Sequence, residues 1–291
     1  MTTDLQCTIF PGEERCCIVV PTKSARAPTF LGFLNSIVAS SGPRPPTIIA
    51  VECEGPSFNF ARSINCGINR ALEFSPKTII MSNDDMRFKL GQVSHMAESL
   101  WKAPNVAYAV PLIVSPHSQL QSGVVMVPNP LLLYPFLTFY GLIPSFLLDH
   151  LGGFGIVQTS PVLARQFRTF KRRRLLPLIV PIASLQPLSI VRADVLEDVG
   201  LYDVGYWNGL EDVDLSLRIV LKGYRVLIDN HITTTHLGSE TGGQGWNSLI
   251  GKGRLGGERT LNNWKRFVTK FPPPVFRRAN DLLRQNTVIV S

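Results

Sequence analysis

Two adjacent carboxylates follow an apolar run in the segment "TIIMSNDDMRF", residues 78–88. The run ends in Ser82 and Asn83, and Asp84 and Asp85 come directly after them. Two neighbouring negative charges repel each other, so they are either solvated in a loop or hold a cation between them. Carboxylate oxygens are ligands that Mg²⁺ and Mn²⁺ accept. The pair is therefore a candidate metal site, with a solvated loop as the alternative.

A second group of acids opens the segment "EDVDLSLRIVLKG", residues 211–223, where the apolar spacing predicts a helix. Its first turn contains Glu211, Asp212 and Asp214. Acids in this position stabilise a helix through its macrodipole, so they need no chemical role. A carboxylate that faces a substrate can instead act as a general base. Adjacent helix residues point about 100° apart, so only one of Glu211 and Asp212 can do so.

His236 lies in the polar, glycine-rich stretch "HITTTHLGSETGGQG", residues 231–245, for which we expect a loop. Imidazole is a common metal ligand, but a loop histidine is also ordinary polar surface. The residue types alone leave both roles open.

Strands and helices alternate in the first part of the chain. Apolar runs predict strands at residues 16–21, 47–53, 77–82 and 106–114. Helical spacing predicts helices at residues 28–40, 59–74 and 92–103. This alternation predicts an α/β fold whose mostly parallel, Rossmann-like sheet carries helices on both faces. Such sheets bind ligands beyond the carboxyl ends of their strands, which is where Asp84 and Asp85 fall.

The regular pattern is lost between about residues 115 and 185 and then resumes. The later part predicts a short helix at 192–200, a helix at 211–223 and a strand at 224–229. Lys222 and Gly223 fit the end of the second helix.

Five segments carry a resemblance to a known family when they are taken together and in order. They are "CCIVVPTKSAR" (16–26), "NFARSINCGINRALEFSPKTIIMSNDDM" (59–86), "PLSIVRADVLEDVGLYD" (187–203), "GLEDVDLSLRIVLKGYRV" (209–226) and "THLGSETGG" (235–243). They resemble the inverting, metal-dependent glycosyltransferases of family 2, in particular its rhamnosyl- and galactofuranosyltransferase-like members. The resemblance covers roughly residues 16–114 and 186–245.

This resemblance implies the GT-A fold and the transfer of a sugar from a nucleotide-diphosphate sugar to a hydroxyl of a glycan, glycolipid or glycoprotein. It also implies a single GT-A domain over residues 16–245, with an insertion at about 115–185. Residues 1–15 would be an N-terminal extension, and residues 246–291 a C-terminal helical tail.

The metal-binding roles follow from the same resemblance. Asp85 matches the last acid of the family's DxD motif and would hold Mn²⁺ or Mg²⁺, with His236 as a second ligand from across the site. Asp84 would face the ribose or the sugar, and Asn83 takes the first position of the motif. The metal would stabilise the negative charge that develops on the leaving phosphates. An imidazole ligand is tolerated better by Mn²⁺.

For the nucleotide-sugar donor, the resemblance implies contacts with Pro21, Thr22 and Lys23, with Glu52, and with Arg62 near the base or the phosphates. The family more often has aspartate at the position of Glu52.

The remaining implied roles concern the acceptor side. Asp212 matches the position of the family's general base, and Glu211 would contact the acceptor or the donor sugar. Tyr206 and Trp207 offer ring faces on which a sugar could stack, and packing at the flank of the helix is an equal alternative.

The net charge of +8 is concentrated in one patch. Six cations and no acid lie within residues 165–174, and without them the formal charge would be +2. Such a patch can meet phosphates. It lacks interleaved aromatic residues other than Phe167 and Phe170, and no glycine-rich phosphate loop opens the chain, so we expect no nucleic-acid partner.

The five cysteines form no CxxC pair and are odd in number, which predicts thiols in a reducing compartment. The N-terminal residues lack the features of a secretory signal, and we expect a cytoplasmic protein.

The insertion contains an uncharged segment at residues 123–148, followed by the six cations. Prolines at positions 128, 130, 135 and 144 argue against one continuous spanning helix. An apolar segment followed by cations predicts a peripheral contact through residues 123–174 with the cytoplasmic membrane face. A buried lid or an oligomer contact is the alternative.

Overall fold

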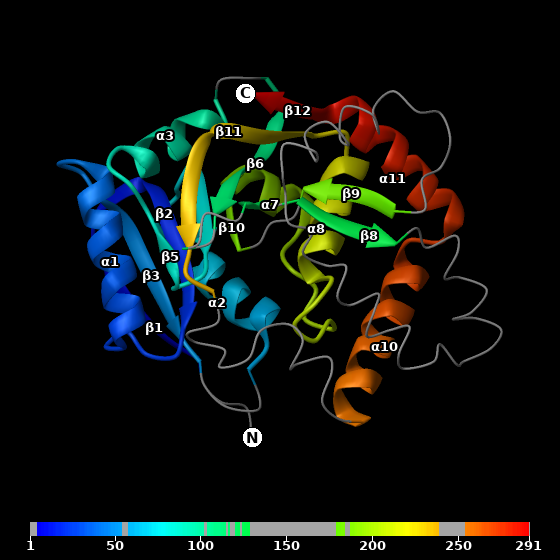
Figure 1. Cartoon of the computed structure of the whole chain (residues 1–291), viewed down its shortest axis with the longest axis horizontal. Coiled ribbons are helices and arrows are strands. Elements are labelled where there is room, and N and C mark those ends of the chain that lie inside the picture. The colour runs from blue at the N-terminus through cyan, green and yellow to red at the C-terminus, as the bar shows by residue number, and fades with distance from the viewer. Residues whose placement is uncertain are drawn as a thin grey trace.

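The computed structural model describes residues 5–53, 58–101, 104–114, 116, 120–122, 124–128, 179–183, 187–238 and 254–290. A central sheet crosses the molecule with helices on both faces, so the predicted α/β class is confirmed (Figure 1). The strand order is β1-β3-β2-β4-β10-β6-β11-β12, with β5 attached to β11 and β7 attached to β6. Most neighbours on this path are parallel, but β10 runs antiparallel to both β4 and β6.

The first half of the chain folds as the alternation predicts. Its strands are β1 (Gln6–Phe10), β2 (Glu13–Thr22), β3 (Pro46–Glu52), β4 (Thr78–Ser82), β5 (Met86–Arg87), β6 (Val106–Val114), β7 (Leu120–Ser122) and β8 (Val124–Pro128). Its helices are α1 (Pro28–Ser41), α2 (Phe60–Leu72) and α3 (Gln92–Ser99).

The second half supplies four further strands and four further helices among the described residues. Its strands are β9 (Ile179–Ala183), β10 (Leu188–Arg192), β11 (Arg225–His236) and β12 (Thr287–Val290). Its helices are α7 (Ala193–Val199), α8 (Glu211–Leu221), α10 (Arg254–Lys270) and α11 (Pro273–Asn286).

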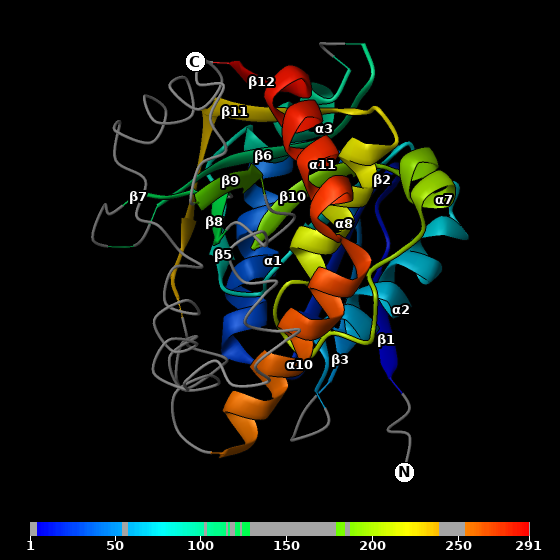
Figure 2. The same ribbon diagram turned by 90° about the vertical axis from the view of Figure 1, so that its right-hand side faces the viewer.

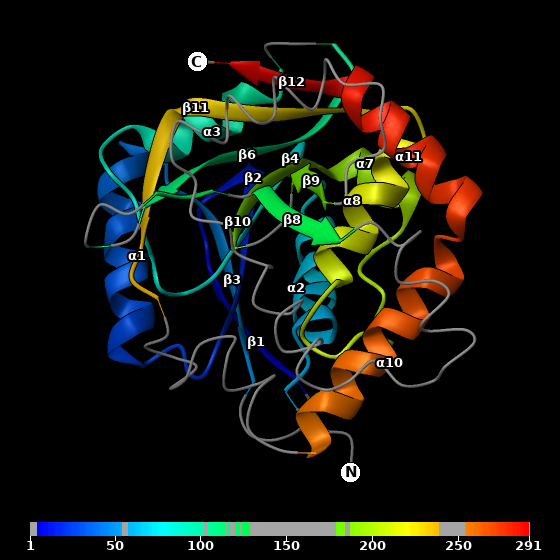
Figure 3. The ribbon, with the colours of Figure 1, turned by 45° about the vertical axis from the view of Figure 1, so that its right-hand side comes forward.

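Alternate side chains of each strand enter two separate cores, one on each face of the sheet. In β2, Ile18 and Val20 belong to the core that also contains side chains of α1 and α3, whereas Cys17 and Val19 belong to the core that contains side chains of α2 and of the C-terminal helices. This alternation is the two-residue period of a strand that is buried on both faces. Figure 3 shows the sheet between α1 on one side and α2, α8 and α11 on the other.

The two ends of the chain belong to this sheet. The predicted N-terminal extension contains β1, which pairs antiparallel with β3 at the edge. The predicted helical tail contains α10 and α11, but it ends in β12, which pairs parallel with β11. Figure 2 shows α10 and α11 following one another along the side of the molecule that also carries α8.

Two expectations about the second half need correction. Residues 231–236 were expected in a loop, but they continue β11 as far as His236. The parallel sheet is also interrupted by the antiparallel strand β10, which the segment at 188–192 was not expected to form.

Most of the 115–185 insertion lies outside the described residues. Its described parts are β7 and the antiparallel pair β8–β9. The predicted membrane contact through 123–174 falls almost entirely outside the described residues. Within the part that is described, no helix has the length and apolar character that a membrane span requires.

Gly67 allows α2 to approach the sheet closely. A Cβ atom at this position would lie inside van der Waals distance of Val19 Cγ1 and 2.8 Å from Val51 Cγ2. Gly67→Ala should therefore lower the free energy of unfolding by about 1–3 kcal/mol, the usual cost of overpacking a core. Chemical denaturation measures this. Asn69→Ala, at an exposed position of the same helix, should change stability by less than about 0.5 kcal/mol. Equal effects of the two substitutions would contradict this packing.

Candidate functional site

The Asp84–Asp85 turn lies at the carboxyl end of β4, and both residues are only 3 % exposed. Asp84 Oδ2 accepts a hydrogen bond of 2.8 Å from the hydroxyl of Thr22, the last residue of the neighbouring strand β2. The turn is held by the Asn83 amide, which donates to the Pro187 carbonyl at 2.9 Å. The pair is therefore built into the strand ends, and the solvated-loop alternative does not fit its burial.

His236 meets Asp85 although the two are far apart in the sequence. The last residues of β11 pair with β5, so that His236 lies opposite Met86. The next amide, of Leu237, donates to the Asp85 carbonyl at 3.0 Å. This places His236 Nε2 3.1 Å from Asp85 Oδ1.

Asp85 Oδ1 is buried, and no hydrogen bond reaches it from the described residues. Leaving a buried acceptor unsatisfied costs about 1–3 kcal/mol. An imidazole nitrogen 3.1 Å away matches the spacing of two neighbouring ligands on an octahedral ion, which are about 3 Å apart when each bond is about 2.1 Å. Asp85 and His236 therefore fit a divalent cation.

Two side chains, those of Asp85 and His236, could hold an ion at this candidate site. The described residues contain no group of three or more His, Cys, Asp or Glu side chains arranged to hold a metal. Mg²⁺ commonly keeps several waters and binds through one or two carboxylates together with substrate phosphates. The donor set of Asp85 and His236 fits that mode and does not fit a closed structural site.

The residues expected to bind a nucleotide line the same edge of the sheet. Thr22 pairs with Glu52 across β2 and β3, so both lie at strand ends. The Glu52 carboxylate accepts a hydrogen bond of 3.1 Å from the Thr8 hydroxyl of β1. Pro21 is buried in β2, and Asn83 is half-buried in the turn.

Two cations lie near these strand ends on the surface. Lys23 is exposed directly after β2, and Arg62 is exposed in the first turn of α2. Asn59 is the N-cap of that helix, and its Oδ1 accepts a hydrogen bond of 2.9 Å from the Arg62 amide.

The first residues of α8 are placed by a strained turn. Asn208 and Leu210 have positive φ values of 44° and 71°, which are uncommon for residues other than glycine. Glu211 is 3 % exposed, and its Oε2 accepts a hydrogen bond from the Gly209 amide. Asp212 is half-buried and is the more accessible carboxylate of the two.

Two tyrosines that the sequence did not indicate lie near the α8 acids, Tyr202 beside β4 and Tyr108 within β6. The Tyr202 hydroxyl lies 3.4 Å from Met81 Sδ in β4. Burial raises the pKa of Tyr202, and the charges of Asp212 and Glu211 raise it further. Burial and the Asp212 charge likewise raise the pKa of Tyr108 in β6. The α8 acids therefore lie over the β4 and β6 region of the sheet.

The two aromatic residues before α8 differ in accessibility. Tyr206 is completely buried, and its hydroxyl donates a hydrogen bond of 3.1 Å to Asp214. No face of this ring is open to a sugar, so the packing alternative accounts for it. Trp207 is half-buried, and Asn263 of α10 holds its amide and carbonyl at 2.8 and 3.0 Å.

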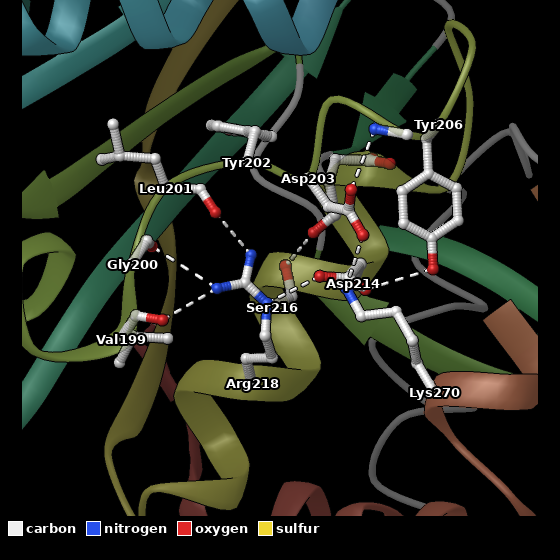
Figure 4. A network of polar contacts seen from close by, with 12 residues as sticks. Val199, Gly200, Leu201, Tyr202, Asp203, Tyr206, Asp214, Ser216, Arg218 and Lys270 are labelled. Carbon is white, nitrogen blue, oxygen red and sulfur yellow. Dashed lines mark hydrogen bonds and ion pairs between the residues drawn. The ribbon is translucent and has the colours of Figure 1, made fainter. Parts of the chain in front are cut away.

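Asp214 is the centre of a buried polar network (Figure 4). Its carboxylate is fully buried and contacts Arg218 Nε at 2.6 Å and Lys270 Nζ at 2.5 Å. Arg218 also donates to the carbonyls of Val199 and Leu201, at 2.9 and 2.7 Å. Of the three α8 acids, this one therefore has a structural role.

Asp203 extends the network toward α10. Burial by itself would raise its pKa, but hydrogen bonds from Arg266, Lys270 and the Gly205 amide hold the pKa well below its usual value. Arg266 makes two of these bonds, at 2.8 and 2.7 Å. The charged form of Asp203 is thus the one that the fold stabilises.

We expect this pKa difference to appear in the pH dependence of stability. A carboxylate whose folded pKa is depressed stabilises the protein above its unfolded pKa, near 4, and loses that contribution as the pH falls toward the folded value. Asp203→Asn should therefore lower the free energy of unfolding at neutral pH. It should also make that free energy fall less between about pH 5 and pH 2 than it does in the wild type. Denaturation followed over pH measures both effects. Asp281→Asn, at an exposed position of α11, is the control. If the free energy of unfolding falls with pH as steeply in Asp203→Asn as in the wild type, the depressed pKa of Asp203 is contradicted.

Comparison with known proteins finds matches among solved structures. No family model and no curated protein matches the sequence. Among 82 matching chains of solved structures is "Mannosyltransferase PcManGT from Pyrobaculum calidifontis in complex with GDP-Man and Mn2+". The alignment has a TM-score of 0.43 and 12% identity, and it covers 92% of this chain and 76% of that one. A likeness of this degree assigns neither an activity nor a residue role to the present chain.

Proposed function

We propose that the protein is an inverting, metal-dependent glycosyltransferase that uses a nucleotide-diphosphate sugar. One observation carries the proposal: the buried, unsatisfied Asp85 Oδ1 faces His236 Nε2 at 3.1 Å, at the carboxyl end of a central strand. Sheets of this type bind nucleotides beyond the carboxyl ends of their strands. The resemblance of five ordered segments to family 2 glycosyltransferases supports the same activity.

In this proposal the strand ends hold the donor. Asp85 and His236 would bind Mn²⁺ or Mg²⁺, which neutralises the charge that develops on the leaving diphosphate. Thr22 fixes the Asp84 carboxylate through its hydrogen bond, so that Asp84 can accept from a hydroxyl of the ribose or the sugar. Lys23 and Arg62 supply positive charge at the same edge.

Asp212 would act as the general base. Inversion requires a base on the face of the sugar opposite the leaving group, where it takes the proton of the attacking acceptor hydroxyl. Asp212 is the more accessible of the two adjacent acids, whereas Glu211 is occupied by the amide of its own turn. Glu211 would then position the sugar or the acceptor, with Trp207 as a partly accessible aromatic surface beside it.

The acceptor in this proposal is a hydroxyl of a glycan, glycolipid or glycoprotein. A peripheral membrane contact through residues 123–174 would bring a lipid-linked acceptor to the site. That contact stays a prediction, because nearly all of the segment lies outside the described residues.

A second candidate is a protein of the same fold that binds a nucleotide or glycan without turnover. Asn83 in place of the first acid of the motif favours it, because one negative charge near the metal is lost. The presence of Asp85, Asp212 and His236 favours the enzyme. Hydrolysis of a nucleotide sugar in the presence of Mn²⁺ separates the two, since a binding protein releases no sugar.

Removing either proposed ligand should weaken metal-dependent donor binding. Asp85→Asn removes the charge but keeps the shape, and His236→Ala removes the imidazole. We expect each to reduce the affinity for a nucleoside diphosphate in Mn²⁺ by at least about tenfold. Calorimetric titration measures this. His231→Ala, at an exposed position of the same strand, should bind normally. Wild-type affinity that is unchanged by a chelator would rule out the metal site.

Asp212→Asn should abolish most turnover while donor binding survives. The amide keeps the shape of the side chain but cannot accept the proton, so kcat should fall by about a hundredfold or more. Product release from radiolabelled donor and a separate binding titration measure the two effects. Asp198→Asn, an exposed position on α7, is the matched control. Near-normal turnover in Asp212→Asn with an inactive Glu211→Gln would move the role to Glu211.

A further inference from the structure

Two cysteines that are far apart in the sequence bring their sulfur atoms into contact. Cys7 lies in β1 and Cys66 in α2, 59 positions later, and their Sγ atoms are 3.6 Å apart. Both are reduced thiols and both are half-buried. The contact therefore joins the edge strand of the sheet to the helix that packs beside it.

The other three cysteines have different surroundings. Cys53 Sγ lies 3.6 Å from the Thr22 carbonyl and 3.5 Å from the Val51 carbonyl. Cys17 Sγ lies 3.8 Å from the Glu14 carbonyl. Cys16 is the next residue along β2, and successive side chains of a strand point to opposite faces. Geometry therefore distinguishes Cys7 and Cys66 from the rest.

Closing this contact into a bond requires a small movement. A disulfide has a sulfur–sulfur distance of about 2.05 Å, so the two atoms must approach by about 1.5 Å from 3.6 Å. β1 is the edge strand of the sheet, and among the described residues it pairs only with β3, from Gln6 opposite Glu52 to Phe10 opposite Ile48. An edge strand with one neighbour can shift more readily than a central strand with two.

We propose that Cys7 and Cys66 form a dithiol modification site, which small disulfides such as glutathione disulfide oxidise to an intramolecular disulfide. One cysteine loses its proton and attacks a sulfur of the oxidant, and the displaced glutathione leaves as a thiol once it is protonated. The second cysteine then attacks the cysteine sulfur of the mixed disulfide and releases the second glutathione in the same way. The protein loses two protons and two electrons, and the oxidant is reduced to two thiols.

The surroundings make this reaction slow. Burial raises the pKa of Cys7 to about 12, and the adjacent Cys66 thiol contributes to the rise. Arg70 in the last turn of α2 lowers the pKa of Cys7, and Glu73 at the C-cap of that helix raises it. Because the thiolate is the attacking species, oxidation at neutral pH should take on the order of hours.

The crosslink would hold β1 on the sheet. It would enclose the segment that contains β2, α1 and β3, and it lies next to Thr8, whose hydroxyl binds Glu52. A bond that closes a loop of this size stabilises chiefly by restricting the unfolded chain. Whether Cys7 and Cys66 are reduced or joined would therefore change the stability of the protein at its edge strand β1, and this holds whether or not the protein is a glycosyltransferase.

The experiment oxidises the full-length protein with glutathione disulfide and then blocks the remaining thiols with iodoacetamide. Mass spectrometry should show a protein about 2 Da lighter before blocking, with the Cys7 and Cys66 peptides joined and separable by dithiothreitol. The melting temperature should rise by about 5–10 °C. Cys53→Ser should still show the joined peptides and the higher melting temperature after oxidation, whereas Cys7→Ser and Cys66→Ser should show neither.

Three results would overturn the proposal. A stable glutathione adduct on either cysteine would show that the second attack does not occur. A bond between Cys16 and Cys17, or between two chains, would assign the oxidation elsewhere. Complete alkylation of Cys7 and Cys66 after a day in the oxidant would show that the pair does not react.

Discussion

The arrangement of the second half of the chain depends on the ion pairs of one fully buried carboxylate, that of Asp214. An ionised carboxylate costs several kcal/mol to remove from water, and only nearby opposite charges and hydrogen bonds offset that cost. Asp214 receives them from Arg218 on its own helix, from Lys270 on α10 and from the Tyr206 hydroxyl. These partners come from three segments, so α8, the turn before it and the C-terminal helices have to pack together. The C-terminal helices therefore share one core with α8.

Three asparagines fix the turn that leads into α8. Asn59 caps α2 and donates to the Tyr206 carbonyl at 2.8 Å, and Asn208 accepts from the Phe60 amide at 2.7 Å. Asn263 of α10 donates to the Gly209 carbonyl at 3.0 Å. The left-handed conformation of Leu210 costs roughly 1–2 kcal/mol, which these bonds offset. The strained residues come directly before Glu211 and Asp212, so the turn determines how α8 begins.

Uninterrupted apolar runs and helical periods were predictable, and short segments without either were not. The strands β2, β3, β4 and β6 were expected because each contains a continuous run of buried apolar side chains, and the helices α1 and α2 because their apolar side chains recur at a helical spacing. The strands β1, β10 and β12, of four or five residues, were not expected. The location of Asp84 and Asp85 followed from local pattern. The pairing of Asp214 with Lys270 did not, because no local pattern relates α8 to α10.

The meeting of His236 with Asp85 depends on a break in the pairing of β6 with β11. Pro111 lies opposite Asp229, and the next pair is Leu112 with Thr233, so residues 230–232 are extra on β11. Proline has no amide hydrogen for the ladder and is placed at such irregularities. The Asp229 carboxylate accepts one of the displaced amides, that of His231, at 3.0 Å. If β11 instead kept regular pairing with β6 beyond Asp229, residue 230 would take the place of Thr233 opposite Leu112. Side chains alternate with a period of two, so this shift of three positions would carry His236 past Met86 and turn it to the opposite face. A proline and an aspartate in two different strands thus determine that the imidazole reaches the acid pair.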